Sequence, residues 1–493
     1  MYRSVFVGCK KNIFAALLVA LFMSSCTGDF LDKSPSDQVT TKEAITTLSD
    51  VKNAVNGLYS LMASVYYYDL SMFLYGDIKG DCMQPTSWSG GRQGYSFYFF
   101  DHTASVPNNG GLWGRPYYIV RNAFNVIKAI DDGKVNATQA ELANYRGEAL
   151  AAIALCYFDL TRLYGYPYAK DNGASPGVPL LDHAIGYGET STRSSVAECY
   201  EYIINKLKEA IPLLSNSRND GHLNSYAARA LLARTYLYCG KNKEAFGTAD
   251  MLINDLKSTG LYYLVDNAHY ADMYAWGNKF GAEALFQVSN TPTSNPGRDG
   301  LSFMLHWWGY AAVVLTDDFA QKLKSDPADV RNQLVATYQD GGDHQYYNLL
   351  LKYPGEKGYD SPSFDNNYTV IRLSEVYLIA AEAGLKAGGE LRQPALDYLN
   401  DIVRRANPDA SVSDDEFTLD RVLDERAKEL VGEGHRYFDL LRNGKKIVRR
   451  GGKHLPNAPE EIDWNYYKCV LPISRDEFTF NPDMEQNEGY TKE

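Results

Sequence analysis

Apolar residues recur every three or four positions along much of the chain, which is the period of an amphipathic α-helix. One such run covers residues 142–163 and ends before Gly165. Another begins at Val196, where Ser195 and Glu198 have the spacing of a capping box. Further helices are predicted at about 42–62, 114–131, 223–239, 241–257, 369–388, 392–405 and 419–433. The pattern therefore predicts a mainly α protein.

Two of these helical segments are similar to each other. The segment LLARTYLYCGKNKEAFGTADMLI (231–253) aligns with YLIAAEAGLKAGGELRQPALDYLNDIV (377–403), and the alignment pairs Gly240 with Gly388. Small residues and a turning glycine at these places resemble the tetratricopeptide helix pair. Two unrelated helical hairpins would give the same similarity, since helices with small residues often pack closely.

Two other segments, 66–114 and 258–368, show little periodicity and are rich in Gly, Pro, Asn and aromatic residues. Loops of this length inside a compact protein are usually functional or disordered. The aromatic content argues against disorder, because disordered segments are poor in aromatic residues. We expect an ordered, loop-rich lobe with little β structure, packed against the helix pairs.

The negative net charge of the chain argues against nucleic acids as partners. The chain has 493 residues and a formal net charge of −12, so it lacks the basic surface that nucleic-acid binding requires. Tyrosine is abundant, with 38 residues. Because tyrosine combines a flat apolar face with a hydroxyl group, this composition suits both protein interfaces and sugar rings.

The N-terminal region has the pattern of an export signal. Eleven apolar residues at 13–23 follow a basic stretch, and this run is too short for a transmembrane helix. The sequence Met-Ser-Ser-Cys at 23–26 is typical of a bacterial lipobox, in which Cys26 receives the lipid. We expect a signal peptide at 1–25 and lipidation of Cys26. The alternative is a signal peptide that is cut after a small residue and leaves a free chain.

Sequence patterns for cofactors and catalysis are missing. After removal of the signal peptide and lipidation of Cys26, five cysteines remain without a CxxC pair, and we expect them to be small buried hydrophobes. The eight histidines are at least nineteen residues apart, and no Walker, Rossmann or GxSxG motif occurs. No metal, cofactor or catalytic residue is predicted. A carboxylate pair for glycoside hydrolysis has no characteristic sequence pattern, so the absence of motifs does not exclude such a pair.

The segment LDERAKELVGEGHRYFDLLRNG (423–444) places Glu429, Glu433 and His435 close together. A zinc-binding helix would need two histidines at i and i+4, and this segment has one. Its apolar positions have helical spacing. We therefore expect its charged residues to form paired structural contacts, rather than a metal or acid–base site.

Aromatic residues in the loop-rich segments are the candidates for ligand binding, since an aromatic residue on a helix usually belongs to the core. The candidates are Trp88, Arg92, Tyr95, Trp307, Trp308 and Tyr310. The alternative is that each aromatic side chain packs against its own loop, because tryptophan is often buried. Trp113 is expected to pack on the helix that follows it, and Trp276 to have a local core of its own.

Eight motifs in order resemble the SusD/RagB family of outer-membrane nutrient-binding lipoproteins. They are the Cys26 lipobox with FLDKSPSD, GDIKGD (76–81), YYIVRNAFNVI (117–127), GEALAAIALCYFDLTRLYGYPY (147–168), RSSVAECYEYIINKLKEAIPLL (193–214), RLSEVYLIAAEA (372–383), LDERAKELVGEGHRYFDLLRNG (423–444) and LPISRDEFTFNPDMEQNEGY (471–490). Each motif alone is weak, but together they cover nearly the whole chain.

The resemblance implies a SusD-like fold and a partner, a SusC-like TonB-dependent transporter in the outer membrane. The lipoprotein would cover the extracellular mouth of this barrel as a hinged lid and deliver a captured glycan. In the family, ligand-binding aromatics come from the two loop-rich regions, which assigns this role to the candidates above. The resemblance implies no catalysis.

The resemblance also implies an organisation along the chain. Residues 26–257 would form an N-terminal SusD-like part with the helical scaffold, and 258–493 a C-terminal RagB/SusD part, together one compact unit. Glycan capture is the first hypothesis. A lid for peptides, a surface glycosidase or esterase, and a pure scaffold remain as alternatives.

Overall fold

The computed structural model describes residues 45–86, 94–105, 107–186, 188–218, 220–339, 346–358, 360–451 and 454–492, and these are mainly helical. The helices are α2 (Leu48–Met62), α3 (Ser71–Ile78), α4 (Tyr95–Tyr98), α5 (Pro107–Asp131), α6 (Gln139–Tyr164), α7 (Val196–Ala210), α8 (Ser225–Tyr238), α9 (Asn242–Thr259), α10 (Leu301–Leu305), α11 (Asp317–Lys324), α12 (Leu373–Ala387), α13 (Arg392–Ala406), α14 (Leu419–Leu430), α15 (Arg436–Arg442) and α16 (Arg475–Phe480). None of the helices in this part of the chain has the length and apolar character of a membrane span.

The strands are short and lie mostly in the second half of the chain. They are β1 (Met83–Pro85), β2 (Pro176–Pro179), β3 (Arg193–Ser195), β4 (Ala284–Val288), β5 (Val313–Leu315), β6 (Val335–Gln339), β7 (Tyr346–Leu350), β8 (Tyr368–Arg372), β9 (Ile447–Val448) and β10 (Glu461–Ile462). A four-stranded antiparallel sheet has the order β1-β5-β7-β6. The pairs β2–β3, β4–β8 and β9–β10 form two-stranded ribbons.

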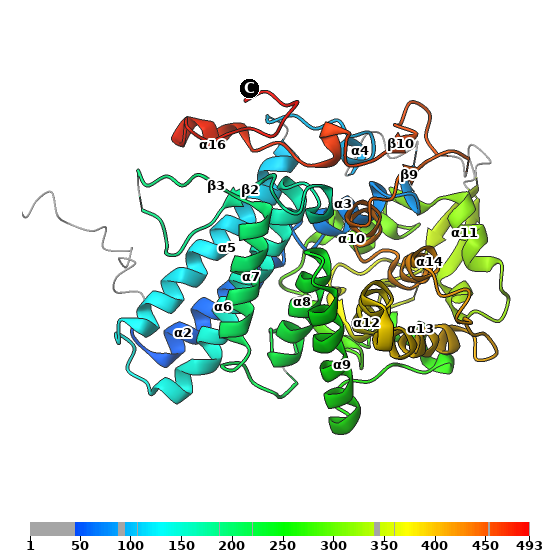
Figure 1. The fold of residues 1–493 in the computed structure, drawn as a ribbon, viewed down its shortest axis with the longest axis horizontal. Helices are drawn as coiled ribbons and strands as arrows, with labels where there is room; N and C mark the ends of the chain where they lie inside the picture. The colour runs from blue at the N-terminus through cyan, green and yellow to red at the C-terminus, as the bar shows by residue number, and fades with distance from the viewer. Residues whose placement is uncertain are drawn as a thin grey trace, which may run out of the picture.

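The long helices form one continuous array (Figure 1). Helices α5, α6, α7, α8 and α9 each pack against the next, and α9 then packs against α12, which pairs with α13. The array therefore joins helices from both halves of the chain. It forms the scaffold against which the shorter elements and loops are packed.

Sequence signals at the helix ends act as predicted. Ser195 accepts a hydrogen bond from the backbone N–H of Glu198 at 3.2 Å, and the Glu198 carboxylate accepts one from the backbone N–H of Ser195 at 2.7 Å. This is the capping box that the sequence predicts for α7. Such boxes satisfy backbone donors that a helix leaves unpaired at its start.

The two similar segments both fold as helix pairs, α8–α9 and α12–α13. The aligned glycines occupy the turns, where Gly240 has φ of 72° and Gly388 has φ of 67°, in the left-handed region that favours glycine. Small residues allow close packing inside the second pair, because a Cβ atom on Gly384 would lie 2.5 Å from the Cβ of Ala395. The predicted helix pairs are confirmed.

One predicted helix starts later than its apolar pattern suggests. Residues 369–372 belong to strand β8, and α12 begins at Leu373. Thr369, Val370 and Ile371 include β-branched side chains that favour a strand, and β4 supplies the pairing partner. A continuous buried apolar run does not distinguish the two structures by periodicity alone.

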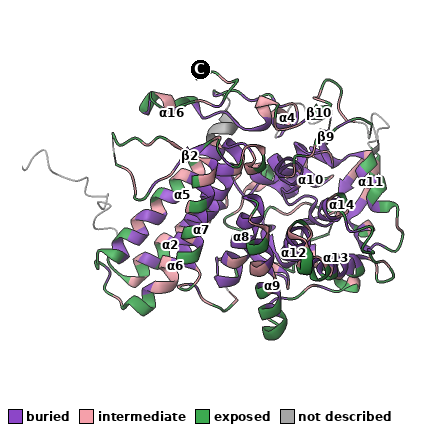
Figure 2. Cartoon of the chain, in the orientation of Figure 1, coloured by how far each residue is buried: buried purple, intermediate pink, exposed green. Residues whose placement is uncertain are grey.

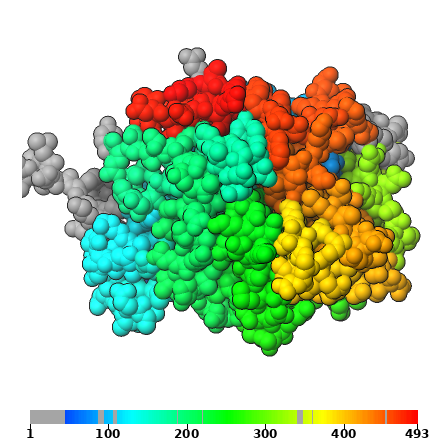
Figure 3. All heavy atoms as spheres, in the orientation of Figure 1, coloured from blue at the N-terminus to red at the C-terminus, as the bar shows by residue number. Residues whose placement is uncertain are grey.

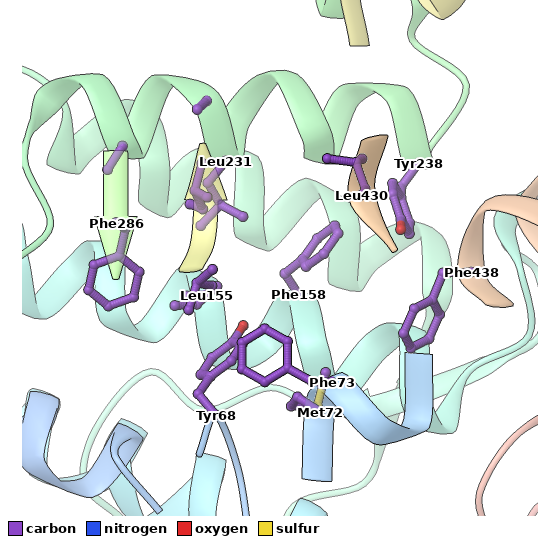
Figure 4. Close-up of a cluster of buried hydrophobic side chains, with 14 of the residues drawn as sticks. Tyr68, Met72, Phe73, Leu155, Phe158, Leu231, Tyr238, Phe286, Leu430 and Phe438 are labelled. Atoms are coloured by element: carbon purple, nitrogen blue, oxygen red, sulfur yellow. The ribbon is translucent and has the colours of Figure 1, made fainter. Parts of the chain in front are cut away.

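One large hydrophobic cluster extends from Val51 to Met484. Buried residues concentrate on the inward sides of the helices (Figure 2). Side chains from distant segments converge there, including Phe73 of α3, Phe158 of α6, Phe286 of β4 and Phe438 of α15 (Figure 4). The five cysteines predicted to be small buried hydrophobes are free and buried, as predicted.

The C-terminal segment lies across one edge of the helical array, where it covers the surface in red (Figure 3). Its backbone is attached to the end of α6, since the N–H of Leu471 donates to the carbonyl of Leu163 at 2.8 Å. The side-chain amide of Asn487 also donates to the carbonyl of Tyr164 at 2.8 Å. The end of the chain therefore holds the last turn of α6 in place.

Candidate ligand-binding site

The two loop-rich segments meet in the four-stranded sheet. Strand β1 pairs with β5, and the backbone N–H of Thr86 donates to the carbonyl of Ala312 at 2.9 Å. The Thr86 hydroxyl donates to the carbonyl of Ala311 at 3.0 Å. Trp88 and Arg92 follow Thr86 in the sequence but lie outside the described residues. The last described residue before them is thus held next to the loop that carries Trp307, Trp308 and Tyr310.

That loop, residues 306–311, is a tight turn after α10. The carbonyl of His306 accepts hydrogen bonds from the N–H groups of Gly309 at 2.9 Å and Ala311 at 3.1 Å. A Cβ atom at Gly309 would lie 2.2 Å from the carbonyl oxygen of Phe303, so only glycine fits there without a backbone shift. These hydrogen bonds enclose Trp307 and Trp308, so the turn fixes the backbone of both tryptophans.

His306 supports the turn from inside. The backbone N–H of Trp308 donates to Nδ1 of His306 at 3.1 Å. Burial lowers the pKa of His306 below its usual value, which favours the neutral imidazole. Nδ1 can accept a hydrogen bond only when it is unprotonated. By favouring the neutral ring, burial of His306 therefore preserves the hydrogen bond that holds the backbone of Trp308.

Trp307 and Trp308 lie side by side, with ring centroids 5.0 Å apart. Trp307 also contacts Tyr338 of β6 at 5.1 Å, with the rings at 74°, and Tyr338 is paired across the hairpin with Tyr347 of β7. We call Trp307, Trp308, Tyr338 and Tyr347 the aromatic ledge. Trp307, Tyr338 and Tyr347 pack over the small buried cluster of Ala311, Val314 and Leu349.

Trp308 is the exposed member of the aromatic ledge. Its side chain is 61% exposed, whereas Trp307 is half-buried. A large aromatic surface in water is unfavourable, and its exposure beside a rigid turn leaves a flat face available for a ligand. The C–H face of a sugar ring can stack on such a surface.

The other described candidates are oriented by different neighbours. Tyr310 contacts Phe303 at 5.1 Å, and Phe303 stacks on the half-exposed Phe364 at 5.4 Å. Tyr95 begins α4 and contacts Phe99 of the next turn at 4.8 Å. The structure therefore brings Trp307 and Trp308 together on the aromatic ledge. Tyr310 belongs to a group with Phe303 and Phe364, and Tyr95 makes a separate contact.

Sequence reasoning missed Tyr338, Tyr347 and Phe364. A signal for the first two was present, because YQDGGDHQYY places aromatic strand residues around an Asp-Gly turn, which is typical of a β-hairpin. No comparable local signal marks Phe364, whose partner Phe303 is distant in sequence.

Trp113 has the local contact that the sequence suggested, whereas Trp276 is hydrogen-bonded to a residue that is distant in sequence. Trp113 is buried within α5, contacts Tyr117 at 4.9 Å and donates its indole N–H to Glu477 at 3.0 Å. The indole N–H of Trp276 donates to Asp365 at 3.0 Å. Trp113 is thus a core residue, while Trp276 borders a small pocket.

The charged residues of segment 423–444 form a buried ionic network. Glu429 accepts hydrogen bonds from Arg372 at 2.7 Å and Arg405 at 2.6 Å, and Glu433 accepts from Arg372 and Lys352, both at 2.7 Å. Burial alone would raise the pKa of Glu429, but the guanidinium groups around it outweigh burial and hold it well below its usual value. The predicted structural pairing is confirmed, and Glu429 remains an ionised acceptor.

Among the residues that the structure describes, no group of three or more His, Cys, Asp or Glu side chains could hold a metal ion.

Known proteins are similar to this chain in both sequence and fold. The model described as the SusD family matches residues 303–490, and the one described as starch-binding and associating with the outer membrane matches residues 29–237. The Starch-binding protein SusD of Bacteroides thetaiotaomicron is 33% identical over 132 residues, which are 26% of this chain and 22% of that protein.

Solved structures extend the similarity to the whole described fold. A SusD superfamily protein from Bacteroides vulgatus has 49% identity and a TM-score of 0.87, over 91% of this chain and 100% of that one. Another from Bacteroides thetaiotaomicron has 35% identity and a TM-score of 0.83, over 90% and 99%. With the predicted motifs and the helical architecture, these matches show that the chain belongs to the SusD/RagB family.

Proposed function

We propose that this chain is a cell-surface glycan-binding protein that captures an oligosaccharide or polysaccharide for import. The exposed indole of Trp308, held beside Trp307 on the aromatic ledge, is the observation that carries the proposal. Binding sites for small ligands usually combine such apolar surfaces with a few polar groups. Candidate polar groups are Arg92 and the Asn and Asp side chains nearby in sequence, and Trp88 would supply a further stacking surface.

Names of related proteins support a glycan as the cargo. One matching family model is described as starch-binding, and the 33% identical relative is named a starch-binding protein. The ionic network around Glu429 gives no support to a hydrolase, because a general acid needs a carboxyl group that can carry a proton near neutral pH. On the strength of those names, binding without bond cleavage is the activity that we propose.

The proposal includes an anchor and a partner. Residues 1–25 would be removed as a signal peptide, and a lipid on Cys26 would attach the chain to the outer membrane, facing the extracellular side. Residues 26–257 and 258–493 would act as one unit, a hinged lid over a SusC-like TonB-dependent transporter. The description of the matching family as associating with the outer membrane supports this location.

Affinity electrophoresis through gels containing amylopectin, galactomannan, xylan or pectic galactan tests the cargo. We expect at least one polysaccharide to retard the purified chain, with no increase in reducing ends during incubation. If none of them retards it while a mixed peptide library binds in calorimetry, the cargo is peptide. Release of reducing ends that disappears on replacement of one carboxylate would show an enzyme instead.

Fractionation of cells that produce the chain tests the anchor and the partner. We expect the wild-type protein in the outer-membrane fraction, accessible to protease on intact cells, and a barrel of the TonB-dependent class to co-purify with it. Cys26→Ser should leave the membrane fraction, because a folded chain without a lipid has no described membrane-spanning helix. Retention of Cys26→Ser on the membrane without the barrel would contradict the lipid anchor.

A further inference from the structure

A small pocket lies beside Trp276, between the 3₁₀ turn η5 (Ala271–Tyr274) and the strands β4 and β8. Its volume is about 30 Å³. The residues along its inner wall include the buried Tyr353 and Asn367, while the exposed Ala275 and Asn278 stand at its rim. The pocket therefore leads from the surface to buried polar groups.

Two of the buried lining residues each have a side-chain polar atom without a hydrogen-bond partner among the described residues. The Nδ2 atom of Asn367 and the hydroxyl of Tyr353 make no hydrogen bond within the described part of the chain, although these residues are only 7% and 5% exposed. Leaving such groups unpaired is unfavourable, so buried polar groups almost always have a partner. Tyr353 also has φ of 61°, a strained conformation that is typical of functional sites when a bulky residue holds it.

The volume limits what the pocket can hold. A space of 30 Å³ accommodates one or two water molecules, or one hydroxymethyl group, but not a sugar ring. A ligand would therefore insert only an edge, while its ring stays outside. The half-exposed indole of Trp276 lies beside the pocket, where it could contact that ring.

The charges around the pocket favour a neutral ligand group. Lys279 is paired with Asp365 at 2.9 Å, and Arg372 is paired with Glu283 and with the glutamates of the buried network. The groups without partners are an amide N–H and a phenol hydroxyl, both neutral. A hydroxyl group matches them, whereas a carboxylate would approach Asp365 and Glu283 without a free cation to pair with.

One short segment connects this pocket with the aromatic group of Tyr310. Phe364 stacks on Phe303. Asp365, which follows Phe364, accepts the hydrogen bond from the indole of Trp276, and Asn367 lines the pocket. Three residues span on the order of 10 Å at most. A ligand of several sugar units is long enough to reach from one place to the other.

We propose that the Trp276 pocket is a second saccharide subsite, which takes a hydroxyl or hydroxymethyl edge of a neutral sugar while Trp276 stacks against its ring. This inference rests on glycan capture as the function. It adds that neutral sugars are preferred over uronic acids and that longer chains gain affinity from the second contact.

Calorimetry on Trp276→Ala and Trp308→Ala tests the subsite, with maltohexaose and maltotriose as one pair of probes and mannohexaose and mannotriose as the other. We expect Trp276→Ala to weaken a hexasaccharide five- to tenfold and to leave its trisaccharide unchanged. Trp308→Ala should weaken both lengths. Trp276→Phe, which keeps a ring but loses the bond to Asp365, should weaken the hexasaccharide less.

Fluorine NMR on chain labelled with 5-fluorotryptophan provides an independent readout. The signal of Trp276, assigned from Trp276→Phe, should shift with the hexasaccharide that binds and should not shift with hexagalacturonate. If that hexasaccharide binds normally to Trp276→Ala and leaves this signal in place, the pocket holds ordered water only and the subsite is overturned, while glycan capture stands. A shift with hexagalacturonate would overturn the preference for neutral sugars. If no saccharide binds the wild-type chain, both proposals fail.

Discussion

Replacing Trp308 with alanine is expected to weaken polysaccharide binding about thirtyfold while the fold stays intact. The exposed indole would lose its stacking contact with the sugar. Burying one face of an aromatic ring removes about 80 Å² from water, which at about 25 cal/mol per Å² is about 2 kcal/mol. Since 1.4 kcal/mol corresponds to a factor of ten, the loss is about thirtyfold.

Calorimetry with a polysaccharide retained in the gel assay measures this loss, and thermal unfolding checks the fold. Tyr263→Ala is a matched control, because Tyr263 is 60% exposed, close to the 61% of Trp308, and lies outside the aromatic ledge. It should bind as the wild type does. Equal affinity of Trp308→Ala and the wild type would remove the aromatic ledge from the binding site.

Replacing Glu429 with glutamine is expected to lower the free energy of unfolding by about 3–5 kcal/mol, the usual cost of breaking a buried ion pair by removing one partner. Glu429 is fully buried and bonded to Arg372 and Arg405, with Arg331 at 3.5 Å. The neutral amide would leave these guanidinium groups undercompensated in the core. Glutamine has nearly the same shape, so packing changes little.

Urea unfolding followed by circular dichroism measures the effect. Glu201→Gln is the control, since Glu201 pairs with Lys241 at 3.1 Å on the exposed surface, where such pairs contribute about 0–1 kcal/mol. If both variants unfolded at the same urea concentration, the network would not stabilise the fold.

The same variant should change how stability depends on pH. The folded-state pKa of Glu429 lies below its unfolded value, so the stabilisation is complete above the unfolded pKa of about 4.3 and is lost as the pH falls toward the folded value. Wild-type stability should therefore fall more steeply below about pH 5 than that of Glu429→Gln.

Local sequence signals predicted the fold well wherever local physics controls it. The capping box at Ser195, the turns at Gly240 and Gly388, and the buried face of α14 all follow from contacts or dihedral angles within a few residues. Strand β8 was mistaken for the start of a helix, because its pairing with β4 depends on residues some eighty positions away. Strands β1 and β5 escaped prediction for the same reason, because they pair with each other from distant parts of the sequence.

For the binding site, the sequence identified the residue types and the two segments but not the arrangement. It singled out Trp307 and Trp308 because they lie in a loop-rich segment, whereas an aromatic residue on a helix usually belongs to the core. It gave no sign of Phe364, and Tyr338 and Tyr347 were overlooked although the Asp-Gly sequence between them is typical of a β-hairpin. The pocket beside Trp276 could not be foreseen, since Tyr353 and Asn367 meet there only through the folding of β8 and its neighbours.

The sequence by itself determined the helical scaffold, the family and the set of aromatic residues available for binding, because hydrophobic period, capping and motif order are properties of neighbouring residues. Only the tertiary structure decided which of these aromatics is buried, which forms a platform, and which ionisable groups are paired. Burial and pairing depend on atoms brought together from distant parts of the chain, and that information appears in no single stretch of sequence.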